Sequence, residues 1–244
     1  MLSPENLAFI RSQELEDLLR YLVGRDVLEV GAGSGHQARA LAERGFVVSA
    51  VDLPGSGDRL ERVYPVLEYD GTRLPFPDRS FDLVFSSNVL EHVRELPALL
   101  AETARVLRPG GYAIHTMPTP AWRSWSTVSG YLDVFAYLAA VVTGRLSMTP
   151  LGVARAVAAR LVPLSHGKRV PALLELWAWR RRRWIEAFER AGFEIMRAEP
   201  MNLFYTGWCV FGRRWPIAAR RRAARWLGSA SCLYQVRPVR RVQG

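Results

Sequence analysis

The sequence predicts an α/β protein with a doubly wound, mostly parallel sheet, and three observations carry this prediction. Short apolar runs alternate with helix-like segments through the first half of the chain. A glycine-rich loop follows the first apolar run and opens a helix, and later runs end in Asp, Ser or Asn. Alternation of this kind implies parallel strands joined by crossover helices. The 244 residues suffice for one such domain with insertions.

In the first half of the chain we expect five strands and three helices. The strands are predicted at 26–30, 46–51, 66–69, 81–85 and 112–116, and the helices at 15–22, 36–44 and 96–107. Gly24 and Gly45 follow the first two helices, and Pro109-Gly110-Gly111 breaks the third. Ligands of such sheets bind at the carboxyl ends of the strands, so the residues that follow each strand are the site candidates.

The second half differs in composition, because residues 122–164 are rich in Ala, Val and aromatic side chains. This stretch predicts two or three helices inserted after the fifth strand. One helix is then expected at 173–191, a strand at 193–198, a helix at 216–227 and a last strand at 231–236.

The net charge of +10 is concentrated in that second half. Residues 1–120 hold 12 Lys or Arg and 17 Asp or Glu, whereas residues 121–244 hold 21 and 6. A helical wheel of residues 216–227 separates the arginines into two groups. Arg220 lies in the apolar half, and a basic arc holds Arg221, Arg222 and Arg225. Together with the tryptophans beside Arg180–Arg183, such an arc suits a membrane surface, a phosphate-bearing ligand or RNA. A solvated face is the ordinary alternative.

Cysteine usage and apolar runs bear on location. Cys209 and Cys232 have no metal or redox spacing, so we expect a reduced, intracellular protein with no metal site. The acidic N-terminal segment predicts no signal peptide. The longest apolar run, 134–142, is far shorter than the about 20 residues of a membrane span. We therefore expect a cytoplasmic protein, with at most peripheral contact to the inner face of an anionic membrane. Its oligomeric state is left open.

A glycine loop, Gly31-Ala32-Gly33-Ser34-Gly35, follows the first predicted strand, with Glu29 just before it. Glycines let the backbone turn tightly and let a ligand lie against it, and the helix behind them offers unpaired N–H groups. Dinucleotide-binding domains share this logic, so the loop alone is weak evidence. Its G-x-G-x-G spacing displaces the last glycine of the dinucleotide motif and disfavours a nicotinamide dehydrogenase.

Four segments in order resemble the class I S-adenosylmethionine-dependent methyltransferases, in particular the small-molecule group that includes the ubiquinone-biosynthesis enzymes. They are VLEVGAGSG, the acid of AVDL, YDGTRLPFPDRSFDLVFSSNVLEHV and RVLRPGG. The resemblance covers about residues 26–116. It implies a Rossmann-like, seven-stranded sheet with helices on both faces, a helical insertion after strand five, and S-adenosylmethionine as cofactor. The predicted parts are a cofactor-binding core (1–120), an insertion acting as lid or acceptor wall (121–170), and a basic C-terminal completion of the sheet (171–244).

The resemblance also implies roles for residues at the strand ends. The methionine end of the cofactor would be held by Glu29, Gly31, Ala32, Gly33 and Gly35. Asp52, with Leu53 beside it, would accept hydrogen bonds from the ribose diol. Asp70 and Gly71 would read the adenine amine, and Ser87 and Asn88 would lie under the methionine moiety. Each residue also has a structural interpretation, since Asp52 and Asp70 could simply form turns.

Methyl transfer depends mainly on aligning a nucleophile behind the sulfonium, and a general base is needed only for a weakly acidic hydroxyl or a protonated amine. The candidate bases are His92, His115 and His166. His92 follows Glu91 at a helix start and could serve only as a cap or ion pair. His115 lies late in strand five, near the carboxyl edge, and His166 lies in a loop of the insertion, where acceptor-binding groups are common.

We expect the methyl acceptor to be small or lipid-linked, such as a sugar hydroxyl or carboxyl in glycan biosynthesis. FYTGWCVFG at 204–212 and the arginine-rich helix after it resemble a bacterial subgroup linked to polysaccharide or glycolipid biosynthesis. One alternative is an RNA methyltransferase, which the basic half permits, although no RNA-binding module or NPPY-type motif is present. A non-catalytic cofactor-binding module is another, and the intact loop and both acids argue against it.

Overall fold

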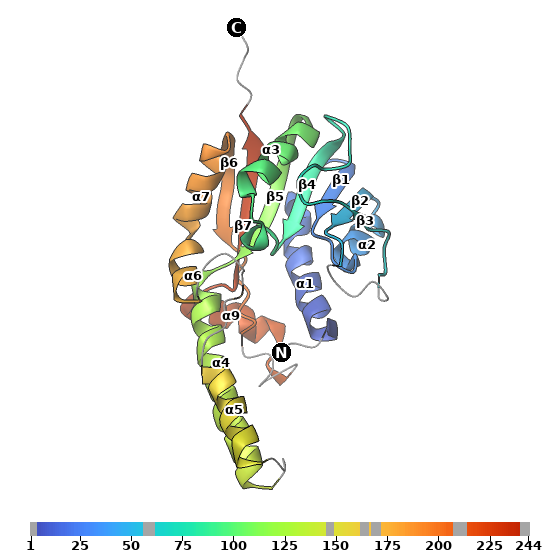
Figure 1. The fold of residues 1–244 in the computed structure, drawn as a ribbon. Helices are drawn as coiled ribbons and strands as arrows, with labels where there is room; N and C mark the ends of the chain where they lie inside the picture. Colours follow the sequence, from blue (N-terminus) through green and yellow to red (C-terminus); the bar gives the residue numbers. More distant parts are fainter. Residues whose placement is uncertain are drawn as a thin grey trace. The chain divides into compact units, whose positions relative to one another are not determined.

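A computed structural model describes most of the chain and divides it into two compact units (Figure 1). The described residues are 4–55, 62–144, 149–161, 166, 172–206 and 214–239. Unit 1 comprises Met1–Pro118, Arg181–Met201 and Ser231–Gly244, and unit 2 comprises Thr119–Arg180 and Asn202–Ala230. The chain therefore enters unit 2 twice, once after each passage through the sheet of unit 1.

Within the described residues, unit 1 holds a seven-stranded sheet in the order β3-β2-β1-β4-β5-β7-β6. Its strands are β1 (Asp26–Val30), β2 (Val47–Asp52), β3 (Leu67–Glu68), β4 (Phe81–Ser87), β5 (Leu107–Pro118), β6 (Phe193–Pro200) and β7 (Ser231–Pro238). Strands β1 to β5 pair in parallel, and β7 runs antiparallel between β5 and β6. The expected doubly wound, mostly parallel sheet is confirmed. Its strand order reverses between β1 and β4, which is where ligands of such sheets bind.

Helices cover both faces of this sheet, as expected. The helical elements of unit 1 are α1 (Pro4–Leu18), η1 (Leu19–Tyr21), α2 (His36–Ala42), η3 (Leu90–His92), α3 (Leu96–Val106) and α7 (Arg181–Arg190). Leu18 of α1 and Leu41 of α2 share one buried cluster with Phe85 of β4. Side chains alternate along a strand, so the next positions face the other side. There Phe188 of α7 stacks on His115 at a centroid separation of 5.5 Å.

Strand β5 begins at Leu107, five residues earlier than predicted, because the Pro-Gly-Gly run forms an irregularity inside the strand. The register to β4 shifts between Phe81 and Leu83. A Cβ on Gly111 would lie 3.0 Å from the carbonyl oxygens of Arg108 and Asp82, so this close backbone approach favours glycine. The Arg108 guanidinium donates to Asp26 at 2.6 Å and to Asp82 at 2.8 Å. Arg108, which precedes the run read as a helix breaker, therefore joins β5 to the amino ends of β1 and β4.

Unit 2 is helical in its described residues. Its helices are α4 (Pro120–Val142), α5 (Pro150–Leu161), α6 (Ala172–Ala178) and α9 (Ile217–Leu227). α4 runs beside α5 as a long pair and also contacts α6 (Figure 1). Arg123 of α4 forms an ion pair with Glu175 of α6 at 3.0 Å, and both side chains are buried. The two or three helices predicted after strand five are thus confirmed.

The single helix predicted at 173–191 is wrong, because the chain breaks between α6 and α7. α6 buries Glu175 in unit 2, whereas α7 buries Trp184 and Phe188 in unit 1. The two helices therefore bury their residues in different cores. The C-terminal third is accordingly divided between the units, and it does not form the one block expected at 171–244.

Helix α4 differs from expectation in its apolar length. Among the described residues it is the one helix long and apolar enough to cross a membrane, by length and composition alone. The sequence shows no uninterrupted apolar run of this length, because Arg123 and several Ser and Thr residues lie between the apolar side chains of the helix. Large apolar side chains are exposed along the helix, namely Val128, Tyr131, Leu132, Phe135 and Val142.

Candidate functional site

The glycine loop and the acid of β2 meet at the carboxyl edge of the sheet. The backbone N–H groups of Gly31 and Ala32 donate to the carbonyl of Val51 at 2.8 and 3.1 Å. The N–H of Gly33 donates to Oδ2 of Asp52 at 2.6 Å. Two residues that lie 19 positions apart in the sequence are therefore joined directly, as the sequence implied.

At two positions of this loop the absence of a side chain matters, for different reasons. Gly31 has φ +76°, and a Cβ there would lie 2.3 Å from Cγ2 of Val89, so this glycine allows close packing beneath the loop. Gly33 has φ +57°, and a Cβ there would meet nothing within 4 Å. Gly33 therefore borders open space where a ligand can approach the backbone. The loop ends at Gly35, which caps α2 and donates to the Ala32 carbonyl at 2.8 Å.

Glu29, at the end of β1, is a buried carboxylate with an unused acceptor. Its side chain is 2% exposed, and no described residue hydrogen-bonds to Oε2. Burial raises the pKa of Glu29 to about 8, and the nearby charge of Asp52 acts in the same direction, whereas an N–H from Ala38 opposes it. An unsatisfied buried oxygen calls for a donor, and a cationic amine would satisfy it best. The amino group of S-adenosylmethionine fits this requirement.

Asp52 holds the loop in place and keeps capacity for a ligand. Its Oδ1 accepts from the N–H of Leu53 at 2.6 Å, while Oδ2 is occupied by Gly33. Each carboxylate oxygen can accept a second hydrogen bond, which leaves positions for a ribose diol. Leu53 beside it is half exposed, as a residue lining a ligand site would be.

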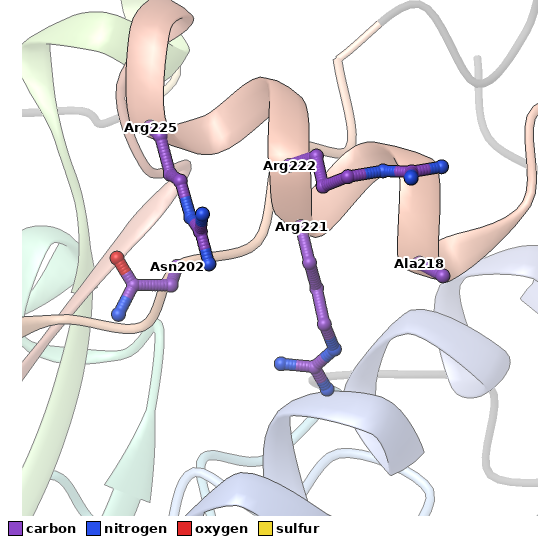
Figure 2. A pocket seen from close by; sticks show the side chains of 5 residues that line it. All are labelled: Asn202, Ala218, Arg221, Arg222 and Arg225. Atoms are coloured by element: carbon purple, nitrogen blue, oxygen red, sulfur yellow. The ribbon is translucent and has the colours of Figure 1, made fainter.

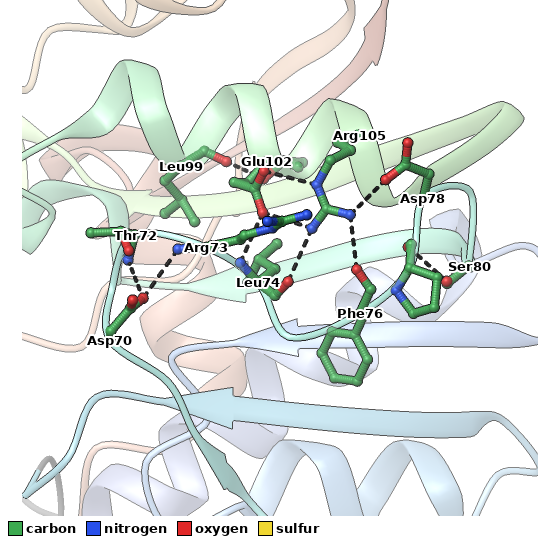
Figure 3. Close-up of polar contacts among 12 residues, drawn as sticks. Asp70, Thr72, Arg73, Leu74, Phe76, Asp78, Ser80, Leu99, Glu102 and Arg105 are labelled. Atoms are coloured by element: carbon green, nitrogen blue, oxygen red, sulfur yellow. Dashed lines mark hydrogen bonds and ion pairs between the residues drawn. The ribbon is translucent and has the colours of Figure 1, made fainter.

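Asp70 forms a turn, which the sequence analysis gave as the alternative to a role in cofactor binding. Its Oδ1 accepts from the N–H groups of Thr72 at 2.8 Å and Arg73 at 3.1 Å (Figure 3). A hydrogen bond from the Thr72 side chain, together with these backbone bonds, lowers the pKa of Asp70. A Cβ on Gly71 would lie 2.8 Å from Cδ2 of Leu53, so the ends of β2 and β3 are adjacent. A role for Asp70 and Gly71 toward adenine stays a prediction.

Arg105 of α3 positions the segment that carries Asp70, and the sequence analysis did not single it out. Its guanidinium donates to the carbonyls of Leu74 at 3.0 Å and Phe76 at 2.8 Å, and to Asp78 at 2.8 Å (Figure 3). Glu102, one turn earlier, accepts from both Arg105 and the Leu74 N–H. The signal was present in RVLRPGG, but partners about 30 residues earlier could not be read from the motif.

Ser87 and Asn88 end β4 and are held by neighbouring elements. Thr116 donates through Oγ1 to Ser87 Oγ at 3.1 Å and accepts from the Asn88 N–H at 2.8 Å. The Asn88 side-chain oxygen accepts from Arg11 of α1 at 2.6 Å. Asn88 adopts φ +55°, a conformation that Asn tolerates better than most residues.

Glu91 is a second buried carboxylate at this edge. It is 3% exposed, and neither carboxylate oxygen has a hydrogen-bond partner among the described residues. Burial raises its pKa to about 8, partly opposed by Arg11. Its neighbour His92 is exposed, with Nε2 3.8 Å from Oε1 of Glu91. Glu91, which the sequence analysis did not list among the candidate bases, is therefore a candidate proton acceptor.

The prediction that His115 faces substrate is wrong. Its ring is 1% exposed and stacks on Phe188, with Nδ1 2.8 Å from Ser86 Oγ. Burial lowers its pKa to about 3, so it is neutral. Its place in the strand order was correct, but its side chain points into the core. His166 belongs to unit 2, is exposed, and lies edge-on against Trp122 and Trp179.

The aromatic segment at 204–212 is described only in part. Phe204, Tyr205 and Thr206 are buried within unit 2. Trp208 and Cys209, which the sequence analysis named, lie outside the described residues.

Comparison with known proteins agrees with this geometry. Residues 28–115 match the methyltransferase domain family. Malonyl-[acyl-carrier protein] O-methyltransferase of Serratia marcescens is 36% identical over 124 residues, which cover 47% of this chain and 49% of that protein. Demethylmenaquinone methyltransferase of Beutenbergia cavernae is 36% identical over 125 residues, covering 49% and 52%. The chain thus spans about half the length of these curated relatives.

The fold is shared more widely than the sequence. An S-adenosylmethionine-dependent methyltransferase of Mesorhizobium loti superposes with a TM-score of 0.54 at 19% identity, covering 94% of this chain and 97% of that one. Similarity at this level establishes the fold. The family match, at residues 28–115, includes the glycine loop and Asp52.

Proposed function

Because residues 28–115 form an S-adenosylmethionine-dependent methyltransferase domain, we propose that this chain transfers the cofactor's methyl group to an acceptor bound beside it. The observation that carries the proposal is the unpartnered Oε2 of buried Glu29, next to the open space in front of Gly33. Oε2 of Glu29 requires a hydrogen-bond donor on the ligand, and the open space at Gly33 allows the ligand to approach the backbone closely.

The cofactor, when bound, supplies an electrophilic methyl group. The protein must therefore orient the acceptor toward this methyl group and accept the proton that the acceptor loses. Glu29 would bind the amino group, and Asp52 would bind the ribose diol while it continues to accept from the Gly33 N–H. Burial raises the pKa of Glu91 to about 8, and in its ionised form this carboxylate would accept the proton that an acceptor hydroxyl loses. A carboxyl acceptor is already ionised and needs no base. His92 stands beside it as a second proton carrier.

Calorimetry with S-adenosylmethionine, S-adenosylhomocysteine and NAD tests this function. We expect the first two to bind in the micromolar range, about −8 kcal/mol, and NAD not to bind. Binding of NAD without S-adenosylhomocysteine would contradict the proposal. Cofactor binding without methyl transfer to any acceptor pool would instead indicate a non-catalytic module.

We propose a small or lipid-linked acceptor, with a sugar hydroxyl or carboxyl as the leading candidate. The exposed apolar side chains of α4 support it, because they would otherwise face water. The names of the two relatives, which act on a carrier-linked acyl group and on a quinone precursor, are compatible with an acceptor of this kind. On this proposal residues 121–170 form a lid or a wall for the acceptor.

We further propose a cytoplasmic enzyme with peripheral contact to anionic membrane, since each basic residue near such a surface contributes about 1 kcal/mol. Flotation with liposomes at two salt concentrations, with and without anionic lipid, tests this contact. Binding that needs anionic lipid and weakens with salt would support it. Absence of binding under all conditions would leave an enzyme with a soluble acceptor.

A further inference from the structure

Helix α4 has two apolar faces, and unit 2 buries only one of them. Val134 lies eleven residues after Arg123, so both occupy the same side of the helix, and both side chains are buried. Tyr137 and Val141 are half-buried on this side, and Arg123 is held there by Glu175 of α6. The opposite side is exposed and carries a row of apolar side chains, which we call the α4 stripe. It consists of Val128, Leu132, Phe135, Ala139 and Val142.

The α4 stripe follows one line along the helix. Its residues are spaced i, i+4, i+7, i+11 and i+14, so their side chains leave the helix within one narrow arc. With a rise of 1.5 Å per residue, the stripe is roughly 20 Å long. Phe135 is 68% exposed and Val142 is 85% exposed. A continuous apolar surface of this length indicates a contact site, whereas single exposed apolar residues are ordinary.

The stripe extends into a segment that carries positive charge only. Residues 134–174 contain five Lys or Arg and no Asp or Glu. Helix α5, which runs beside α4, carries the exposed Arg155 (Figure 1). An apolar face together with basic residues is typical of helices that lie in the surface of an anionic membrane. The charge of the segment therefore favours anionic lipid as the partner of the stripe.

Two other partners fit the stripe less well. A second copy of the chain would pack stripe against stripe, but the spacing covers only two heptads, fewer than the three or four that specify a coiled coil. The two copies would also bring together segments of the same charge. A nucleic acid would neutralise the basic residues but would leave the apolar side chains without a partner.

We propose that the α4 stripe is the surface through which this protein binds an anionic membrane. The helix lies in the plane of the bilayer, with the stripe inserted about 5–10 Å into the boundary between head groups and acyl chains. It does not cross the bilayer, although its length and composition would allow this, because the buried ion pair of Arg123 with Glu175 holds its other side on unit 2. This surface makes the membrane contact proposed above, on which the assignment rests.

Helix α9 is a useful comparison, because it also exposes basic and apolar residues in unit 2. Arg222 and Arg225 are exposed. In Figure 2, however, Arg221, Arg222 and Arg225 extend in different directions, and Arg225 is directed toward Asn202. Among the described residues of this helix, Trp226 is the one large apolar side chain that is exposed. Helix α9 thus lacks a continuous apolar face, and its residues provide matched controls.

Flotation of the full chain with vesicles of phosphatidylcholine, with and without phosphatidylglycerol, tests the stripe. We expect the wild type to bind the vesicles that contain phosphatidylglycerol, and to bind them less as the salt concentration is raised. Leu132→Gln/Phe135→Gln should weaken this binding at least about tenfold, because it removes apolar area without changing the charge or breaking the helix. Leu132→Met/Phe135→Met keeps the apolar area and should bind like the wild type.

The matched control is Trp226→Gln, which removes an exposed apolar side chain from α9 and should leave flotation unchanged. Arg222→Gln/Arg225→Gln removes two charges from the same helix and should weaken flotation less than the stripe variant does. Thermal melts and affinity for S-adenosylhomocysteine should be the same in all these proteins, because the substituted side chains are exposed.

Three results would overturn the proposal, and they differ in what they leave standing. No flotation of the wild type would reject the stripe together with the membrane contact, whereas binding of S-adenosylhomocysteine would still support methyl transfer. Flotation that the stripe variant does not change, or that Trp226→Gln weakens equally, would reject the stripe alone. A wild-type dimer that sediments without lipid and becomes a monomer in Leu132→Gln/Phe135→Gln would make the stripe an interface between two copies.

Discussion

The two units of this molecule differ in where their polar groups lie. In unit 1 the charged residues of the site stand at the ends of parallel strands, where Glu29 and Glu91 are buried and Asp52 is held by backbone N–H groups. In unit 2 one buried ion pair, Arg123 with Glu175, lies among helices, and the remaining arginines of α9 are directed outward, apart from Arg220. Unit 1 therefore buries carboxylates near its strand ends, whereas helix α9 of unit 2 carries the exposed arginines Arg222 and Arg225.

The family match follows the same division. The match ends at residue 115, and the first segment of unit 1 ends three residues later, at Pro118. The residues that we propose to bind the cofactor, such as Glu29 and Asp52, therefore lie within the family match. On our proposal, the acceptor is selected by the part of the chain that lies outside the family match.

The largest effect that would break this comparison is expected at the buried ion pair of unit 2. Glu175→Gln removes the negative charge that lies 3.0 Å from the buried Arg123 guanidinium and should cost about 3–5 kcal/mol in urea unfolding. The exposed pair Arg182 with Glu186 is the control, since Glu186→Gln should cost less than about 1 kcal/mol. Affinity for S-adenosylhomocysteine, measured under native conditions, should not change. A loss of that affinity would show that the cofactor site depends on unit 2.

The next effect concerns the open space in front of the glycine loop. Gly33→Val should weaken S-adenosylhomocysteine binding at least about 100-fold in calorimetry, because the new side chain occupies the approach to the backbone. Gly45→Val is the matched control, since Gly45 also has a positive φ and open space around its missing Cβ. Both variants should lose about 1–3 kcal/mol of stability from backbone strain. Equal cofactor affinity in the two variants would remove Gly33 from the site.

Asp52 should show a smaller effect on binding. Asp52→Ala removes the acceptor for the ribose diol and should weaken cofactor affinity by about 1.5–3 kcal/mol. The unliganded protein should also lose about 1 kcal/mol, because Asp52 accepts from Gly33 and Leu53. Asp78→Ala, which removes an exposed partner of Arg105, should leave affinity unchanged. Unchanged affinity in Asp52→Ala would assign this carboxylate to the loop alone.

The smallest effect sharpens the role of Glu29 through pH. The pKa of Glu29 is raised from 4.5 to about 8, so between these values the folded protein holds a proton that the unfolded chain has lost. This group therefore lowers stability as pH rises through that window, and Glu29→Gln should gain stability relative to the wild type at the upper end. Stability measured against pH in both proteins checks this.

Binding of a cationic amine requires the ionised form of Glu29. Affinity for S-adenosylhomocysteine should therefore rise between pH 6.5 and 7.5 by at most about tenfold, with proton release visible as buffer-dependent heat. In Glu29→Gln the affinity should be weaker and this pH dependence should disappear. An unchanged pH profile in the variant would assign the titration to another group, such as Glu91.

The sequence by itself determined the cofactor half to a large extent. The apolar run 26–30, its glycine loop and the acid at 52 were placed correctly, because strand alternation and glycine turns are local properties. The doubly wound, mostly parallel sheet was also predicted, since parallel strands with short connections leave few arrangements, whereas the strand order came from the structure.

Only the tertiary structure decided how distant residues share one environment. The side chain of His115 points to Phe188, which comes 73 residues later in the sequence, and Arg105 finds carbonyl partners about 30 residues earlier. The C-terminal third was divided between two units because β6 and β7 pair in unit 1 while α9 packs through Arg220 in unit 2. A sequence pattern indicates which side chains are suited to burial. The residues that cover them are determined by contacts between segments that lie far apart in the chain.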